Sequence, residues 1–197
     1  DWYTVPVELT LSAYDETSGL GATYYRINDG PQHIYSLPFT ISDDGAYTVH
    51  FWSVDNAGNI EPVNTAYFKI DQTAPTTTLT IGEPKYVSGT TYVTPATPFT
   101  LEAIDTGSRV YATAYRIHNT TYNGGWQTYT APFSLISLTD GTYTIEYNST
   151  DNAGNVETTH TINVTLFLWN YIFEDTFGRG TILKINTAQK FLQFITP

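Results

Sequence analysis

The sequence contains no cysteine and no methionine, and few of its side chains are basic. Without cysteine, the chain has no disulfide, no thiolate metal ligand and no cysteine nucleophile. Eight Lys and Arg residues stand against nineteen Asp and Glu residues, which gives a net charge of −11. Such a surface repels phosphate groups and anionic lipid head groups, so we expect neither nucleic acid nor a membrane surface as a partner.

Long hydrophobic runs are absent as well. No stretch approaches the roughly 20 apolar residues that a membrane-spanning helix needs, and we expect no membrane insertion in this segment. No sustained period of 3.6 residues occurs, so essentially no helix is expected. The sequence is instead rich in Tyr, with 16 residues, and in Thr, at about one position in six. Both residue types favour the pleated surface of a β-sheet, and composition therefore predicts an all-β protein.

An internal repeat organises the chain. Tyr25 in the segment ATYYRI corresponds to Tyr115 in ATAYRI, at an offset of 90 residues, and the segment DNAGN at 55–59 recurs at 151–155, at an offset of 96. The additional residues of the second copy fall in the polar stretch HNTTYNGGW. A period above 90 residues suits complete domains in tandem. Within each copy, short alternating runs are separated by turn-forming clusters, a pattern typical of β-sandwiches.

The order of the motifs SG, YRI, PF, DG-Tyr-Thr, DNAGN and TAP resembles the immunoglobulin-like (Ig-like) repeats that occur in tandem on prokaryotic cell-surface and secreted proteins. The resemblance covers about residues 7–75 and 76–166. It implies two tandem Ig-like β-sandwiches that act as spacers, adhesion modules or accessory units beside catalytic domains. In such sandwiches a corner tyrosine bonds backbone, and Tyr47 and Tyr143 occupy the corresponding positions.

We divide the chain into a first Ig-like repeat (1–74), a second Ig-like repeat (75–166) and a β-rich C-terminal extension (167–197). The segment TTTLTIG at 76–82 is a plausible first strand of the second repeat, and its counterpart would lie before residue 1, so the first repeat is expected to lack this strand. The extension contains three apolar runs, and three strands alone are marginally stable. It is expected to pack on the second repeat, to begin a further domain or to pair with another chain.

Acidic and amide side chains at two loops form candidate calcium sites. The DNAGN loop of a sandwich lies at the same end as the loop after the second core strand. Carboxylate and amide oxygens are the ligands that Ca²⁺ prefers. The same residues also suit metal-free turns, so both interpretations stay open, and calcium is the only cofactor considered. The candidate ligands are Asp15, Asp55 and Asn59 in the first repeat, and Asp105, Asp151 and Asn155 in the second.

Three N-x-[ST] sequons lie in the second repeat, at Asn119, Asn148 and Asn163. Such sequons are acceptors for N-linked glycans where the host glycosylates its surface proteins. Alternation along the strands predicts that Asn148 and Asn163 face solvent, and Asn119 lies in the inserted loop. All three are therefore predicted at the surface.

Aromatic residues occupy the equivalent face of the first repeat. Trp52 aligns with Asn148 and Tyr67 aligns with Asn163, and Trp126 follows a Gly-Gly pair in the inserted loop. Exposed aromatic rings stack on sugars or bury in subunit contacts. These three residues are candidate interaction residues, and packing against a neighbouring loop or domain is the alternative.

Nothing in the sequence indicates catalysis. The four His residues show no metal-ligand spacing, and neither a phosphate-binding loop nor a nucleophile elbow occurs. We expect a non-catalytic structural or adhesion module at the outside of a prokaryotic cell, whose partners are other domains or copies of the same surface protein, with glycans as further candidates. Two alternatives stay open: a filament or sheath subunit that assembles by strand exchange, and a carbohydrate-binding accessory domain of a secreted enzyme.

Overall fold

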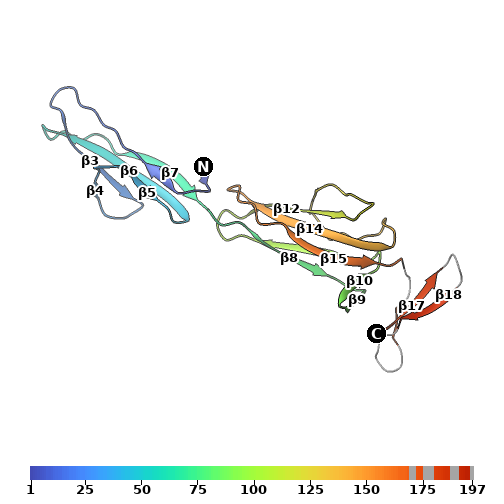
Figure 1. The fold of residues 1–197 in the computed structure, drawn as a ribbon. Coiled ribbons are helices and arrows are strands. Elements are labelled where there is room, and N and C mark those ends of the chain that lie inside the picture. The colour runs from blue at the N-terminus through green and yellow to red at the C-terminus, as the bar shows by residue number, and fades with distance from the viewer. Residues whose placement is uncertain (169–171, 175–179, 187–190, 196–197) are drawn as a thin grey trace. The chain divides into compact units, whose positions relative to one another are not determined.

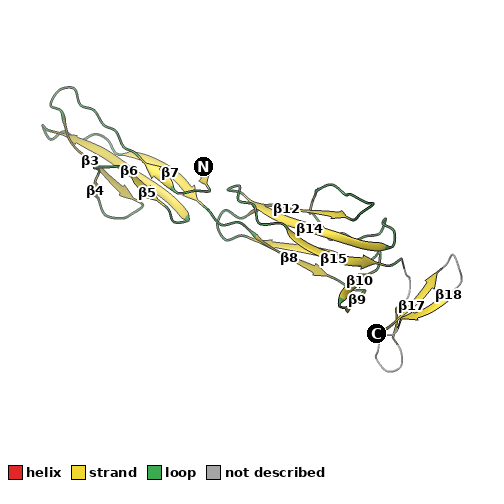
Figure 2. Cartoon of the chain, viewed as in Figure 1, coloured by secondary structure: helices red, strands yellow, loops and turns green. Residues whose placement is uncertain are grey.

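The structure, a computed structural model, describes residues 1–168, 172–174, 180–186 and 191–195. Every regular element in this part of the chain is a β-strand, and Figure 2 shows only strands and loops. The all-β class predicted from composition and alternation is therefore confirmed. The described residues include no helix that could cross a membrane.

The chain forms two compact units. Unit 1 contains the first repeat and two loop segments of the second repeat, and comprises residues 1–75, 104–111 and 150–157. Unit 2 contains the remainder, residues 76–103, 112–149 and 158–197. The first change of unit along the chain falls after Pro75, and the boundary expected between residues 74 and 75 stays a prediction.

The first repeat has two sheets (Figure 1). The larger sheet has the order β1-β7-β6-β3-β4, and β2 pairs with β5 in the smaller one. Strand β1 runs parallel to β7, with Trp2 opposite Lys69, whereas β6 is antiparallel to both of its neighbours. The strands are β1 (Trp2–Tyr3), β2 (Val7–Leu9), β3 (Leu20–Ile27), β4 (His33–Ile34), β5 (Phe39–Ile41), β6 (Gly45–Asp55) and β7 (Asn64–Ile70).

The second repeat follows the same plan with two additions. Its larger sheet has the order β13-β12-β14-β15-β10-β9, and β11 pairs with β8 in the smaller one. Strand β10 runs parallel to β15, as β1 does to β7. The strands are β8 (Thr76–Ile81), β9 (Lys85–Ser88), β10 (Thr90–Val93), β11 (Phe99–Ile104), β12 (Val110–His118), β13 (Gln127–Thr128), β14 (Gly141–Asp151) and β15 (His160–Leu166).

Strand alternation decides which side chains form the two cores. On β14, Tyr143, Ile145 and Tyr147 are buried, and the residues between them lie on the outer face. The main core of the second repeat contains eight buried hydrophobic residues, whereas that of the first contains four, namely Ile41, Val49, Phe68 and Ile70. The first repeat is the less completely buried of the two, because the strand that covers β11 in the second repeat has no counterpart beside β2 among the described residues.

A tyrosine closes the corner of each sandwich. The Tyr47 hydroxyl donates a hydrogen bond to the Asp43 carbonyl over 2.8 Å, and the Tyr143 hydroxyl donates one to the Thr139 carbonyl over 2.8 Å. Both bonds reach back four residues across an Asp-Gly turn. The corner tyrosines that the resemblance implied are confirmed.

The C-terminal extension contains a separate three-stranded antiparallel sheet in the order β16-β17-β18. A strand occupies part of each of the three apolar runs expected there, and residues 169–171, 175–179, 187–190 and 196–197, with all side chains beyond Leu168, lie outside the description. The strands are β16 (Ile172–Glu174), β17 (Gly180–Asn186) and β18 (Phe191–Ile195).

Replacing Tyr143 with Phe keeps the buried ring and removes only the hydroxyl that donates to Thr139. We expect Tyr143→Phe to lower the free energy of unfolding by about 1 kcal/mol, the net value of one such hydrogen bond. Urea unfolding followed by circular dichroism measures the change. Tyr111→Phe is the control, because the Tyr111 ring is 74% exposed, and it should change the free energy by less than about 0.5 kcal/mol. An equal effect of the two substitutions would contradict a stabilising role for the corner bond.

Candidate functional site

The DNAGN loop of the first repeat is closed by its own Asp and second Asn. The Asn59 backbone N–H donates to Asp55 Oδ1 and the Asn59 side-chain amide donates to Asp55 Oδ2, each over 2.7 Å. Gly58 has a φ of +91°, in the left-handed region that glycine tolerates best. Hydrogen bonds from the Asn59 side chain, then from Ser18, hold the pKa of Asp55 at about 2, although burial opposes them.

The same loop in the second repeat has the same geometry. Asp151 Oδ1 accepts the backbone N–H groups of Gly154 and Asn155, and Asp151 Oδ2 accepts the Asn155 side-chain amide. Burial raises the pKa of Asp151, and the bonds from Asn155 and then Gly154 outweigh it, so that the pKa is lowered. The Asp and the second Asn of the motif therefore close the loop in both repeats.

In each repeat the loop after the second core strand is hydrogen-bonded to the DNAGN loop, as the sandwich topology predicted. Asn56 donates from its side chain to the Ser18 carbonyl over 2.9 Å, and Asn152 donates to the Ser108 carbonyl over 2.9 Å. Asp15 Oδ1 accepts the N–H groups of Ser18 and Gly19, which lowers the pKa of Asp15, with the Ser18 bond as the main cause. Predicted ligands from two loops are thus brought to one end of each sandwich.

A third carboxylate, which sequence reasoning missed, joins only the pair Asp105 and Asp151. Asp71 directly follows β7, and one carboxylate oxygen from each of Asp71, Asp105 and Asp151 lies within 4.8 Å of the other two. Asp71 is fully buried and Asp151 is 2% exposed. The signal that could have identified Asp71 is its position, between the end of a strand and the linker proline Pro75.

Backbone groups orient this carboxylate cluster, Asp71, Asp105 and Asp151, within unit 1. Asp71 Oδ2 accepts the Ser108 N–H and Asp105 Oδ2 accepts the Arg109 N–H, each over 2.6 Å. A side chain at Gly107 would lie 2.4 Å from the Asp71 carboxyl carbon, so only glycine permits the loop to approach this closely. Among the side chains of residues 1–168, no Lys, Arg or His forms an ion pair with the cluster.

The cluster has the size that one calcium ion requires. Ca²⁺ binds oxygen ligands at about 2.3–2.6 Å, so two ligands of one ion are at most about 5 Å apart. The 4.8 Å limit of the three carboxylate oxygens agrees with that geometry. Asp15 and Asp55 in the first repeat belong to no group of three ligating side chains within residues 1–168. Among residues 1–168, Asp105 and Asp151 thus belong to a group of three carboxylates, whereas no such group includes Asp15 or Asp55.

The sequons occupy different environments on the second repeat. Asn163 on β15 is exposed, and its side-chain oxygen accepts the Thr144 hydroxyl proton over 2.9 Å. Asn148 on β14 is half-buried and donates to Thr159 Oγ1 over 3.2 Å. Asn119 is half-buried, and its Oδ1 accepts the N–H groups of Thr121 and Tyr122 in a tight turn. Asn163 is therefore the most accessible acceptor of the three.

The predicted interaction aromatics do not form a single platform. Trp52 stacks on Tyr24 across β6 and β3, with ring centroids 5.9 Å apart, and is half-buried. Tyr67 lies on the same face of that sheet and is 73% exposed, opposite Thr48 in the register. Trp126 belongs to unit 2, so only Trp52 and Tyr67 share a sheet face.

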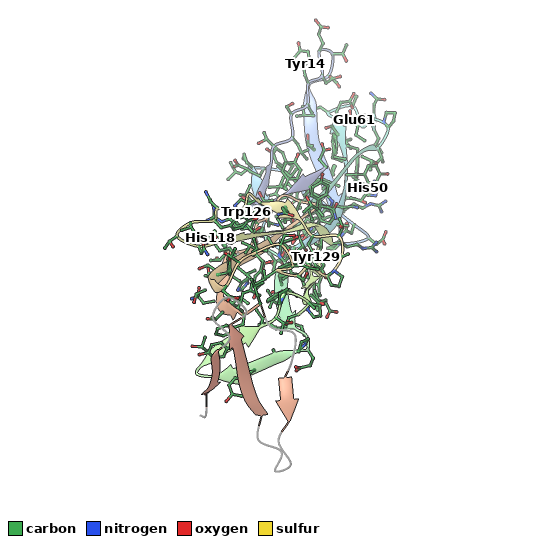
Figure 3. The ribbon with its side chains drawn as sticks, turned by 90° about the vertical axis from the view of Figure 1, so that its right-hand side faces the viewer. Tyr14, His50, Glu61, His118, Trp126 and Tyr129 are labelled. Atoms are coloured by element: carbon green, nitrogen blue, oxygen red, sulfur yellow. The ribbon has the colours of Figure 1, made fainter. Side chains whose placement is uncertain are left out.

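A charged cluster on the outer face of the second repeat was also missed. Arg116 Nε forms an ion pair with Glu146 Oε2, and the Arg116 guanidinium lies 5.3 Å from the centre of the Trp126 ring. The Arg116 guanidinium holds the pKa of Glu146 below its usual range. His118 Nε2 lies 3.5 Å from Glu146 Oε2 and has no hydrogen-bond partner. Figure 3 shows Trp126 and His118 near each other on this face.

The hydrogen bonds that Asn59 donates to the Asp55 carboxylate make the stability of the first repeat dependent on pH. Because the pKa of Asp55 falls from 3.8 to about 2 on folding, its stabilising contribution is complete above pH 3.8 and is lost as the pH falls to about 2. Asn59→Ala should raise this pKa toward 3.8 and move the loss of stability to higher pH. Carbon-detected NMR titration of the Asp55 carboxyl measures the pKa.

The control for this titration is Asn64→Ala. This substitution removes an exposed side-chain amide that donates a hydrogen bond to the Pro62 carbonyl and does not contact the Asp55 carboxylate through a hydrogen bond among the described residues. The control should leave the pKa of Asp55 at about 2. If the pKa of Asp55 stays at about 2 in Asn59→Ala, the hydrogen bond from the Asn59 side chain is not what lowers it.

Comparison with solved structures gives likenesses at low identity, among them the following two. The fibronectin(III)-like modules of Clostridium thermocellum CbhA are 12% identical with a TM-score of 0.37, over 85% of this chain and 87% of that chain. The D00-D0 domain of Intimin is 11% identical with a TM-score of 0.36, over 83% of this chain and 93% of that chain. Likenesses of this extent carry no functional inference, and no curated protein matches the chain.

The family comparison is decisive. The profile of the Bacterial Ig-like domain matches residues 13–72 and 91–166, one segment in each repeat and together more than half of the sequence. Both segments end with the strand that follows the DNAGN loop, and each contains one corner tyrosine. The chain therefore belongs to the bacterial Ig-like domain family.

Proposed function

We propose that this pair of bacterial Ig-like domains is a non-catalytic structural module at the outside of a prokaryotic cell, where it acts as a spacer or an adhesion unit. The observation that carries the proposal is the repetition itself. The second domain reproduces the strand pairing of the larger sheet, the corner tyrosine and the hydrogen-bonded DNAGN loop of the first, and a short segment, Asp71–Pro75, joins β7 to β8. Tandem domains of one design extend a protein in steps of one domain.

The outer face of the second repeat supports an extracellular setting. On β14 and β15, Thr142 and Thr165 share a hydroxyl–hydroxyl hydrogen bond, and the Thr144 hydroxyl donates to Asn163 Oδ1. The exposed sequon at Asn163 offers an attachment point for a glycan on this face. The carbohydrate-binding alternative is supported only by Trp126, which is 45% exposed beside the Arg116 guanidinium. Because Trp52 and Tyr67 are on the other unit, we favour the structural role.

Immunolabelling of the source cells tests this location. Antibodies against the chain should label intact cells, and protease treatment of intact cells should abolish the label. An antibody against a cytosolic protein is the control and should label only permeabilised cells. Labelling by the antibodies against the chain only after permeabilisation would contradict the proposal.

We also propose that the carboxylate cluster of Asp71, Asp105 and Asp151 binds calcium as a structural ion. Three carboxylates within 4.8 Å of one another, two of them buried, repel each other. A divalent cation would replace this repulsion by ligation. The ion would stabilise unit 1, which contains all three residues.

Calcium titration of the melting temperature tests this second proposal. Free Ca²⁺ at about 100 times its Kd should add about 2.7 kcal/mol to the free energy of unfolding, and a chelator should reverse the gain. Asp71→Asn should abolish the response to calcium, because it removes one of the three carboxylates. Asp15→Asn is the control and should keep the response. A melting temperature equal in calcium and in chelator would refute the site.

A further inference from the structure

The segment that joins β7 to β8, Asp71–Pro75 (the linker), is hydrogen-bonded to the turn before β6. Asp44 in this turn accepts the backbone N–H of Gln72 through Oδ1 over 3.0 Å, and its Oδ2 accepts the Thr73 hydroxyl proton over 3.1 Å. The Gln72 side-chain amide donates to Asp44 Oδ1 over 3.1 Å and to the Ser42 carbonyl over 2.7 Å. Both oxygens of one carboxylate therefore bind the linker.

The same contact occurs in the second repeat. Asp140 corresponds to Asp44 at the offset of 96, and Asp140 Oδ1 accepts the backbone N–H of Leu168 over 2.5 Å. Leu168 lies 28 residues after Asp140, as Gln72 does after Asp44. Because Leu168 has no side-chain amide, it offers Asp140 only its backbone N–H. The repetition indicates that the Asp of this turn has one role in both repeats.

Strand register explains why these two Asp residues reach the chain where it leaves each sandwich. Gly45 lies opposite Ile70 in the β6–β7 pair, and Gly141 lies opposite Leu166 in the β14–β15 pair. Because both pairs are antiparallel, the residue before each glycine lies beside the residues that follow the partner strand. The Asp-Gly turn therefore places a carboxylate at the exit of the chain from each sandwich.

The hydrogen bonds of Asp44 favour its ionised form. They lower the pKa of Asp44, with the bond from the Gln72 side chain as the main cause, although burial opposes them. Hydrogen bonds to a charged group contribute more to stability than those between neutral groups. Asp44 is exposed, so each bond competes with water, and the several bonds together hold the linker.

The other residues of the linker are restrained as well. Asp71 Oδ1 accepts the Thr73 backbone N–H over 3.2 Å, and the Asn155 side-chain amide donates to the Asp71 carbonyl over 2.7 Å. Pro75 has a fixed φ, and its ring disfavours helical conformations of Ala74. Each residue of the linker is thus restrained by a hydrogen bond or by the proline ring.

We propose that Asp44 and Asp140 are positioning residues that order the chain where it leaves each sandwich. Residues without such bonds sample several backbone conformations. With Asp44 in place, Gln72 and Thr73 are held against the first repeat, and the linker contains no free hinge. This inference deepens the proposed spacer role and rests on it, since a spacer transmits length only when its joints are ordered.

Amide hydrogen exchange and the ¹H–¹⁵N heteronuclear NOE of the full chain test the role of Asp44. Asp44→Ala should speed exchange of the Gln72 amide by about tenfold or more, because its charged acceptor is lost. The heteronuclear NOE of Gln72 and Thr73 should fall. Asp43→Ala is the control, because it removes the neighbouring exposed charge, and it should leave both readouts unchanged. Unchanged exchange or NOE in Asp44→Ala would overturn the proposal.

The two repeats provide controls for each other. Asp140→Ala should speed exchange of the Leu168 amide and leave that of Gln72 unchanged, and Asp44→Ala should do the reverse. Asp44→Asn keeps an acceptor oxygen for Gln72 and should restore most of its protection. Faster exchange of the buried Val49 on β6 in Asp44→Ala would show that the whole domain is loosened, and it would overturn a local role.

Limited proteolysis by an enzyme of broad specificity gives an independent readout. Asp44→Ala should be cut within residues 71–75 faster than the natural chain and than Asp43→Ala. Equal rates for the three chains would contradict an ordering role for Asp44. All measurements use a chelator, so they do not depend on calcium at Asp71. None of the outcomes bears on cell-surface location, which immunolabelling decides separately.

Discussion

The pairing of β8 with β11 is the constraint on which the rest of the second sandwich depends, and the first sandwich shows what changes without such a pairing at β2. Where β8 pairs with β11, the strand is six residues long, Leu101 is buried and Ser149 meets two hydroxyl groups. Where no such strand is present, β2 has three residues, Leu11 is half-buried and a groove lies over Ser53. Among the described residues, one sequence pattern therefore gives one sandwich with this strand and one without it.

The two DNAGN loops show how the surroundings of one motif decide its chemistry. In both repeats the Asp carboxylate is held by the Asn four residues later, so the motif by itself closes a turn. Only Asp151 also lies beside Asp71, the residue that ends β7 and begins the linker. The third carboxylate therefore depends on tandem order: the residue aligned with Asp71 in the second repeat is Phe167. The three carboxylates of this cluster therefore come from segments of both repeats that unit 1 contains.

Much of the fold could be predicted from the sequence, because period-two alternation and turn clusters are local signals. Tyr47 and Tyr143 were found from the Asp-Gly turn before them, and the meeting of the loops at Asp15 and Asp55 followed from sandwich topology. Asp71 and the ion pair of Arg116 with Glu146 were missed, because their partners are 34 or more and 30 residues away in sequence. Which side chains from separate strands meet depends on the strand register, and a single sequence does not reveal that register.

The groove over Ser53 and the carboxylate cluster are related through β6. This strand runs from Gly45, which pairs with Ile70 next to Asp71, to Asp55 at the edge of the groove. An ion at Asp71 would hold one end of the β6–β7 pair. A cation that binds Asp71 in the folded chain and not in the unfolded chain would stabilise unit 1 by mass action, because the three carboxylates of the cluster meet only after folding.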